Sequence, residues 1–454
     1  MSRIADFIGV SARENVEKAL AKARENEAFH ALLSLTEDRA LERAAKVDAG
    51  EITGRLAGVP FIAKDNFLTL GGTTTAASKF LENFSAPLQA TAIEKLEAEG
   101  AICIGKANLD AFAHGGSTEN SAFGPTKNAH DQERVAGGSS GGSAVAVALD
   151  MVPFALGTDT GGSIRQPASY NGVVGMKPTY GTVSRYGVVA MASSTDTIGV
   201  LSATAEDAEL VMDILSGRDR KDMTTLPDFF APTALSEPKR IGVIKEFMTD
   251  DVDPEVRVRV SEYIEGLKAK GHTVEEVSLP MVKYALAIYY IVVPAEVSSN
   301  LGRYDGVRYG KRAEATSLSE VYGLSRDQGF MPENKRRIMI GSYVLSSGFF
   351  DAYYLKAQKA RTLLIDEFNK IFESFDAIVG PVAPTPAFKL GENTEDPVKM
   401  YLADIMTVPA SLAGLPAISA PAGKTEAGLP VGVQFIGPRM SDATLLALAR
   451  QGEV

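Results

Sequence analysis

The stretch GGSSGGSAVAVALDMVPFALGTDTGGSIRQPA, residues 137–168, holds two clusters of glycine and serine separated by apolar residues. Each cluster is expected at a junction between a strand and a helix. Glycine clusters let the backbone approach a ligand closely and direct several N–H groups into one small space, which suits a phosphate or an oxyanion. An isolated GGS sequence is more typical of a surface turn. Two such clusters beside apolar segments instead indicate a site in an α/β protein.

Outward from this stretch, short β-rich runs alternate with helical segments. Such alternation predicts a sheet covered by helices on both faces. The segment from residue 282 to 375 is expected to be mostly helical and to end in a long helix from residue 351. The β-rich runs and helical segments are expected at 58–65, 88–100, 101–108, 141–151, 152–160, 239–247, 253–271, 272–280, 375–387, 416–423 and 429–437.

The first 50 residues have a different pattern. Residues 14–28 and 36–50 carry apolar side chains at spacings of three and four, which predicts two amphipathic helices, the second ended by Gly50. We therefore expect residues 1–50 to form a helical segment ahead of the main domain. The polar stretch from 217 to 238 is the best candidate for a boundary, although strand and helix patterns continue on both sides of it.

Composition narrows the class of protein. The chain has 454 residues, more than the roughly 250–300 at which one core usually stops growing, so two or three domains or one large domain are expected. Apolar residues make up 45% and charged residues 23%, as in soluble globular proteins. No apolar run reaches the ~20 residues that cross a bilayer, and the N-terminal residues lack the apolar core of a signal peptide. A cytoplasmic protein with no membrane contact is expected.

The charge and the cysteine content exclude further classes. A net charge of −11 argues against a broad basic face that holds a nucleic acid, so another protein chain would carry that role. The single cysteine, Cys103, lies in the apolar run AICIG and is expected to be a buried, inert thiol. No C-x-x-C or H-x-x-x-H pair is present, so no metal site is expected.

Two familiar kinds of glycine-rich site do not fit. GGSSGG matches G-x-S-x-G twice, with Ser139 or Ser140 as the nucleophile of an α/β-hydrolase, but the only later histidine, His272, is expected in a turn that enters a strand. His30 is expected on the N-terminal helices and His130 in a polar turn. The nucleotide pattern G-x-x-x-x-G-K-[ST] and the dinucleotide pattern G-x-G-x-x-G are both absent.

A serine nucleophile without a histidine needs another proton acceptor, and lysine is the obvious replacement. Lysine has a pKa of ~10.4 in water, and burial or nearby positive charge must lower it by ~3 units before the amine accepts a proton near neutral pH. Lys64 follows the apolar run GVPFIA, which would carry it to the end of a buried strand. Most lysines are solvated, but one beside two glycine-serine clusters is a candidate base.

Together, Lys64, Ser139, Ser163 and the glycine-serine block 137–181 resemble the amidase signature family, and the resemblance covers nearly the whole chain from about residue 50. It implies one large α/β/α domain over residues 51–454, built around a mixed sheet, with the segment 1–50 packed on it. It also implies a Ser-cis-Ser-Lys triad with Ser163 as nucleophile, Ser139 as the bridging serine and Lys64 as base. The oxyanion hole that it implies consists of the backbone N–H groups of Thr160, Gly161, Gly162 and Ser163.

Within this family, residues 117–128, 173–196, 351–363 and 400–421 resemble the glutamine-hydrolysing chains of tRNA-dependent amidotransferases. The resemblance implies a heterotrimer with amidotransferase subunits B and C as partners. The B chain would use ATP and Mg²⁺ to activate the glutamyl or aspartyl group of a mischarged tRNA, and the small C chain would clamp the other two together. No cofactor is expected in the present chain, which would supply ammonia from glutamine.

The same resemblance assigns Arg337 and Asp404 to the α-carboxylate and α-amino groups of glutamine, and a zwitterion does call for one fixed cation and one fixed anion. Read alone, either residue is more typical of a surface ion pair, so the assignment rests on the resemblance. Tyr289 and Tyr290 are candidates to line the same pocket. His114 is a further candidate because it stands where an apolar residue is common in these proteins.

Two other departures from the subfamily pattern are Ala111, in place of an acidic residue, and Ala136, in place of a proline.

Two rival functions stay open. A free-standing amidase acting on another carboxamide would share the block around Ser163, and only Arg337, Asp404 and the C-terminal blocks favour glutamine. A non-catalytic assembly protein would keep the fold, but the intact set of Lys64, Ser139 and Ser163 argues against it.

Overall fold

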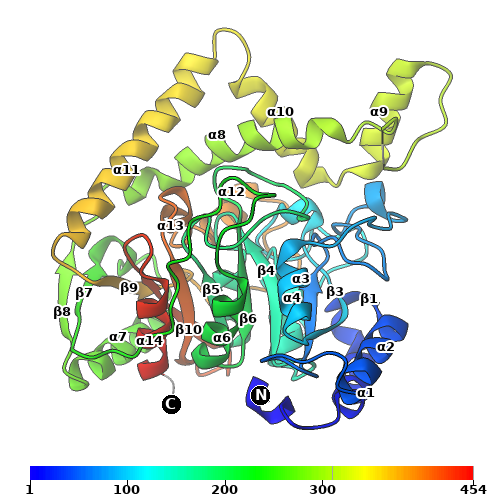
Figure 1. Cartoon of the computed structure of the whole chain (residues 1–454). Helices are drawn as coiled ribbons and strands as arrows, with labels where there is room; N and C mark the ends of the chain where they lie inside the picture. The colour runs from blue at the N-terminus through cyan, green and yellow to red at the C-terminus, as the bar shows by residue number, and fades with distance from the viewer. Residues whose placement is uncertain (309, 453–454) are drawn as a thin grey trace.

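The computed structural model describes residues 1–308 and 310–452 and is built on one 11-stranded mixed sheet, with strand order β1-β3-β2-β4-β6-β5-β10-β11-β9-β7-β8 (Figure 1). Helices lie on both sides of the sheet, which confirms the predicted α/β architecture. The strands are β1 Leu32–Leu35, β2 Pro60–Lys64, β3 Ile102–Ala107, β4 Phe154–Asp159, β5 Val174–Lys177, β6 Thr197–Ser202, β7 Arg240–Ile244, β8 Thr273–Val277, β9 Ala377–Pro381, β10 Ala417–Lys424 and β11 Pro430–Ile436.

The helices are distributed along the whole chain. They are α1 Ala12–Glu25, α2 Glu37–Asp48, α3 Thr91–Ala98, α4 Gly141–Ala148, α5 Arg165–Asn171, α6 Ala205–Leu215, α7 Pro254–Ala269, α8 Val282–Asn300, α9 Leu318–Gly329, α10 Pro332–Val344, α11 Lys356–Phe372, α12 Pro397–Leu402, α13 Val408–Leu412 and α14 Asp442–Gly452. Shorter helical turns are η1 Ile4–Phe7, η2 Glu27–Phe29, η3 Lys79–Leu81, η4 Ala111–Ala113, η5 Lys245–Phe247, η6 Leu301–Arg303 and the π-helical η7 Phe350–Leu355.

Alternation along strands β2 and β4 divides their side chains between two cores on opposite faces of the sheet. In β2, Phe61 and Ala63 enter one core and Ile62 enters the other, and in β4 Leu156 and Ala155 divide in the same way. Helices α3 and α6 close the first core, and α1, α2 and α4 close the second. Both faces of the central strands are covered, which explains why their sequences are continuously apolar.

Helix α7 begins where local chemistry predicts. In α7, the Asp253 carboxylate caps the first turn by accepting from the N–H groups of Glu255 and Val256, and Pro254 occupies the first helical position. The buried side chains of this helix follow the helical spacing and face the sheet. They are Val256, Val260, Ile264 and Leu267.

Four helices, α8 to α11, gather above the sheet in Figure 1, over the end of the molecule opposite the two termini. α10 packs closely on α8 because residue 341 is glycine: a Cβ there would collide with the carbonyl of Pro294. These helices confirm the expectation of a mostly helical segment before residue 375.

Several expectations need correction. His30 lies outside α1 and α2, at the end of turn η2 with φ of 52°. Strand β1 lies within the predicted helical segment 1–50 and pairs with β3, while β5 and β6 were not expected as strands. The glycine-serine cluster before α4 follows a loop rather than a strand. The division at residue 50 stays a prediction. The strands on both sides of the 217–238 stretch join the same sheet.

Leu156 tests the first core. Leu156→Ala should lower the free energy of unfolding by about 3 kcal/mol, because the fully buried side chain leaves a cavity inside the sheet packing. Urea unfolding followed by circular dichroism measures the change. Leu363→Ala on α11 is the matched control, since Leu363 is 56% exposed and should cost under about 0.5 kcal/mol. Equal losses in both variants would contradict this assignment of the core.

Candidate active site

Lys64 is the last residue of β2, and the apolar residues before it carry its side chain into the protein interior. Its Nζ lies 2.7 Å from Ser139 Oγ, 2.9 Å from Ser140 Oγ and 2.9 Å from Thr158 Oγ1. The side chain is fully buried. These three partners are hydroxyls, which are able either to accept from an ammonium or to donate to a neutral amine. A longer contact of 3.4 Å joins Nζ to the carbonyl of Thr158, which only accepts.

Burial lowers the pKa of Lys64 to about 7, although the carboxylates of Asp110, Asp159 and Asp196 act in the opposite direction. A protonated amine loses its hydration in this site, and no carboxylate forms an ion pair with it among the described residues. Near neutral pH a large fraction of Lys64 is therefore uncharged. Burial also raises the pKa of Asp110 to about 6, against hydrogen bonds from the N–H groups of Thr118 and Asn120.

The carboxylate next to Lys64 in the sequence is occupied elsewhere. Asp65 Oδ1 lies 2.8 Å from Nζ of Lys106, a second fully buried lysine on the neighbouring strand β3. The other oxygen of Asp65 accepts from the N–H and hydroxyl of Thr75. Two buried lysines thus lie on adjacent strands, and only Lys106 has a carboxylate partner.

Ser163 lies in the turn between β4 and α5, and its side chain is almost buried, with 8% of the residue exposed. The two glycine-serine clusters meet here, because the N–H of Ser140 donates to the carbonyl of Ser163 at 3.1 Å. The Gly138–Ser139 peptide bond is cis. The fold therefore brings Lys64, Ser139 and Ser163 into one site, as the sequence predicted, while their chemical roles stay predictions.

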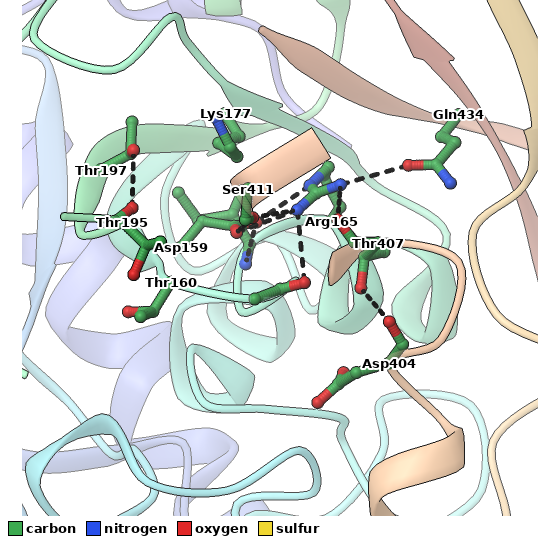
Figure 2. Close-up of polar contacts among 12 residues, drawn as sticks. Asp159, Thr160, Arg165, Lys177, Thr195, Thr197, Asp404, Thr407, Ser411 and Gln434 are labelled. Atoms are coloured by element: carbon green, nitrogen blue, oxygen red, sulfur yellow. Dashed lines mark hydrogen bonds and ion pairs between the residues drawn. The ribbon is translucent and has the colours of Figure 1, made fainter. Parts of the chain in front are cut away.

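A buried ion pair supports the turn that carries Ser163. Asp159 at the end of β4 and Arg165 at the start of α5 form two hydrogen bonds of 3.0 Å across the turn, and both side chains are fully buried (Figure 2). Arg165 also donates to the carbonyl of Thr407 and to the hydroxyl of Ser411. The turn is thereby tied to the segment that carries Asp404.

The predicted oxyanion hole is formed by a glycine turn that other side chains approach closely. A Cβ on Gly161 would lie 2.8 Å from the Tyr289 hydroxyl, and one on Gly162 would collide with Thr407, so only glycine fits at either position. Within the described part of the chain, the N–H groups of Gly161, Gly162 and Ser163 donate to no other protein group. They are available to a ligand.

Arg337 on α10 is buried and does not belong to a surface pair. Its Nε donates to Glu333 Oε1 at 2.8 Å, one helical turn earlier, and its guanidinium lies over the rings of Tyr290 and Tyr401 at 5.2 and 5.8 Å. The Tyr401 hydroxyl donates to the same oxygen of Glu333. The charge of Arg337 also acts against the rise that burial causes in the pKa of the Tyr289 hydroxyl, which lies against Gly161 in the Ser163 turn.

Asp404 lies on the other side of this region, and Figure 2 shows its carboxylate pointing away from Arg165. A Cβ on Gly116 would lie 3.4 Å from its Oδ2. Loss of hydration raises the pKa of Asp404 to about 7, against the opposite effect of Arg337. The site therefore holds one buried cation and one carboxylate with a raised pKa.

His114 is fully buried beside this pair of charges. Its Nδ1 lies 2.7 Å from the carbonyl of Phe112, so Nδ1–H is the donor and Nε2 is left as an acceptor without a partner. Burial and the nearby Arg337 lower the pKa of His114 to about 3. The imidazole is neutral throughout the physiological range.

Some contributors to the site were not expected from sequence. Ser140 and Thr158 contact Lys64, and the pair of Asp159 and Arg165 supports the turn that carries Ser163. Glu333 had a usable signal, since it stands four residues before Arg337 on a predicted helix. The partners of Lys64 come from segments 75 to 94 residues away, a separation that no local pattern encodes.

Two negative expectations concern metals and cysteine. Among residues 1–308 and 310–452, no group of three or more histidine, cysteine, aspartate or glutamate side chains is arranged to hold a metal ion. Cys103 is buried, and burial raises the pKa of its thiol to about 11.

Among residues 1–308 and 310–452, no helix is both long and apolar enough to cross a membrane.

The chain has close relatives among characterised sequences. It is 50% identical over 464 residues to the A subunit of Glutamyl-tRNA(Gln) amidotransferase from Koribacter versatilis, covering 98% of this chain and 96% of that one. It is 53% identical over 434 residues to the protein of the same name from Thermosynechococcus vestitus, covering 93% and 89%.

Solved structures show the same fold. The crystal structure of the A subunit of Glutamyl-tRNA(Gln) amidotransferase from Thermotoga maritima has a TM-score of 0.83 and 42% identity, covering 99% of this chain and 94% of that one. A bacterial aryl acylamidase has a TM-score of 0.87 and 25% identity, covering 100% and 96%. The family model described as Amidase matches residues 14–446. This chain is therefore an enzyme that belongs to the amidase family.

Proposed function

We propose that the chain hydrolyses glutamine to glutamate and ammonia as the A subunit of a tRNA-dependent amidotransferase. The observation that carries the chemistry is the buried Lys64, with a pKa of about 7 and no carboxylate in an ion pair with it among the described residues. The names of the relatives support the amidotransferase assignment. Arg337 and Asp404 support glutamine, because the site offers one charge for each end of an amino acid.

The reaction begins with neutral Lys64, which accepts the proton of Ser139 while Ser139 accepts the proton of Ser163. Ser163 Oγ attacks the carboxamide carbon of glutamine and forms a tetrahedral intermediate. The carbon–nitrogen bond then breaks, and the proton returns through Ser139 to the leaving nitrogen, so that ammonia departs. Water attacks the resulting γ-glutamyl ester by the same relay and releases glutamate and free Ser163.

The glycine turn stabilises the two tetrahedral intermediates. Their negative oxygen accepts from the N–H groups of Gly161, Gly162 and Ser163, with Thr160 at the edge of the same turn. These donors are fixed in place before the reaction, so little reorganisation accompanies the growth of charge. The paired side chains of Asp159 and Arg165 keep the turn rigid.

We assign substrate recognition to the two charged side chains near the glycine turn, Arg337 and Asp404. Arg337 binds the α-carboxylate of glutamine and Asp404 its ammonium group, while Tyr290 and His114 line the pocket. Tyr290 stacks on Tyr401 with ring centroids 3.8 Å apart, which gives the pocket a flat aromatic wall. The neutral His114 offers Nε2 as an uncharged acceptor.

The ammonia serves a second active site on the B chain of the heterotrimer, which would use ATP and Mg²⁺ on glutamyl-tRNA or aspartyl-tRNA, with the C chain holding the assembly together. Free ammonia is mostly protonated at neutral pH, so docking the two enzymes limits its loss. The net charge of −11 assigns the tRNA-binding surface to the partner.

Ser163→Ala tests the nucleophile. Glutamine hydrolysis should fall on the order of 10³-fold or more, because the covalent intermediate is lost while packing barely changes. A coupled assay for glutamate measures the rate. Ser143→Ala is the matched control: its buried hydroxyl on α4 donates to the carbonyl of Leu156, away from Lys64, and its loss should leave the rate within about twofold. More than a tenth of wild-type activity in a folded Ser163→Ala variant would remove Ser163 from its role.

The pH profile tests Lys64 and Asp404 together. Lys64 must be neutral and Asp404 ionised, both have a pKa of about 7, and both therefore lose the active form as pH falls. For glutamine, log kcat/KM should drop with a slope approaching two below pH 7. Asp404→Asn should reduce that slope to one, and Lys64→Arg should be inactive because arginine stays protonated. An active Lys64→Arg variant would show that the base lies elsewhere.

Arg337→Ala separates glutamine binding from ammonia use in the complex with subunits B and C. Glutamine-driven amidation of mischarged tRNA should be lost, whereas amidation driven by ammonium chloride should persist because it bypasses this site. Arg336→Ala is the control, since its side chain is 42% exposed, and both reactions should continue. Loss of both reactions in Arg337→Ala would mark Arg337 as an interface or folding residue. Efficient hydrolysis of other amides but not of glutamine would favour a free-standing amidase.

A further inference from the structure

Strands β4 and β6 pair in antiparallel register up to Asp159 opposite Thr197. The next two residues in this register are Thr160 and Asp196, which lie beyond the strands. A side-chain hydrogen bond joins them instead: Thr160 Oγ1 donates to Asp196 Oδ1 at 2.8 Å. The bond is located where the backbone leaves the sheet and enters the glycine turn before Ser163.

Asp196 is itself firmly held. Its Oδ2 accepts from the N–H groups of Met191 and Ala192 at 2.8 and 3.0 Å, and the side chain is buried. The Ala192 carbonyl in turn accepts from the N–H of Asp196. Residues 191–196 therefore form a closed turn around this carboxylate, which we call the Asp196 turn.

Two helices hold the Asp196 turn from outside. Glu296 on α8 accepts from the N–H of Ser194 at 2.8 Å, and Asn300 donates to the carbonyl of Met191 at 3.0 Å. Arg361 on α11 donates to both the hydroxyl and the carbonyl of Ser194. α8 also carries Tyr289, whose hydroxyl lies against Gly161. Helix α8 thus contacts the glycine turn directly through Tyr289 and indirectly through the Asp196 turn.

The space beside this bond is not filled by packing. A cavity of about 230 Å³ lies along this edge, and Thr158, Thr160, Asp196 and Thr197 are among its lining residues. Along this edge the hydrogen bond from Thr160 to Asp196 links the start of the glycine turn to the residue before β6, in addition to the contacts of the turn with Arg165, Tyr289 and Thr407.

We propose that Asp196 is a positioning residue for the oxyanion hole and acts through the Thr160 hydroxyl. The hydrogen bond between the Asp196 carboxylate and the Thr160 hydroxyl takes the place of backbone pairing just beyond the ends of β4 and β6. It fixes the direction of the N–H groups of the glycine turn that follows. The inference rests on the proposed amide hydrolysis at Ser163 and holds for any carboxamide substrate.

Thr160→Val removes the hydroxyl and keeps the shape of the side chain. The kcat for glutamine in the complex with the partner chains should fall by about tenfold or more, with KM within about twofold, because the donors act on the transition state. Thr160→Ser restores the hydroxyl and should recover most of the loss. Thr197→Val is the matched control: it removes a buried hydroxyl that donates to Thr195 in the same turn and does not reach Thr160.

The Asp196→Asn variant adds a second measurement, the pH profile of kcat/KM, which a loss of packing alone would not change. Its amide oxygen can keep the N–H groups of Met191 and Ala192 while its NH₂ group donates to the Thr160 hydroxyl, so kcat should fall less than in Thr160→Val. Removing the Asp196 charge also leaves only Asp110 and Asp159 to raise the pKa of Lys64, so the acid limb of kcat/KM should move to lower pH. Arg185 is the charged group that acts on Asp196 from the other side and is unchanged. Thr160→Val should not move this limb.

The outcomes separate the inference from the proposed function. A wild-type complex without activity on glutamine or on a simple aliphatic amide such as propionamide would overturn both. An active wild type with Thr160→Val within twofold of its kcat, or with Thr197→Val as impaired as Thr160→Val, would overturn the positioning role alone.

Discussion

The site depends on a lysine buried without a counter-ion. Transferring an ammonium group from water to a protein interior costs several kcal/mol unless a carboxylate accompanies it, so Lys64 responds by releasing its proton more readily. Lys106, on the next strand, shows the alternative, because it lies equally deep and pairs with Asp65. Asp65 lies in the turn that follows β2, and its carboxylate pairs with Lys106 on β3 rather than with Lys64. The two lysines therefore differ in whether a carboxylate accompanies them into the interior.

The acidic and basic groups around the site have distinct structural tasks. Asp159 and Arg165 neutralise each other across the nucleophile turn, and Glu333 holds Arg337 on α10. Asp110 has no cationic partner among the described residues, and its two oxygens instead accept from backbone N–H groups. Removal of one member of a buried pair would leave an uncompensated charge, so these residues are constrained in pairs rather than singly. Arg165 also joins the turn that carries Ser163 to the Asp404 segment, because it donates to the carbonyl of Thr407.

Much of this was predictable from sequence, and the limits have physical causes. The block 137–168 identified Ser139 and Ser163, and the apolar run before Lys64 identified a buried strand end. Strands β1, β5 and β6 were missed because they are short or lie among glycine-rich loops, where the period of two is too brief to recognise. The hydroxyls around Lys64 and the bond from Thr160 to Asp196 depend on the register of strands far apart in the chain, which no local pattern reports. Glu333 was visible as a helical neighbour of Arg337, four residues away.

The strand order has a consequence for the growing chain on the ribosome. β7 and β8, residues 240–277, reach the rest of the sheet only through β9 and β11, which are made more than 100 residues later. Until then this pair of strands has an open edge and lacks its neighbour. The half of the sheet that holds β2, β3, β4 and β6 has all its strands by residue 202, but Arg337 and Asp404 follow much later. During synthesis Lys64, Ser139 and Ser163 are therefore all present long before the chain acquires Arg337 and Asp404.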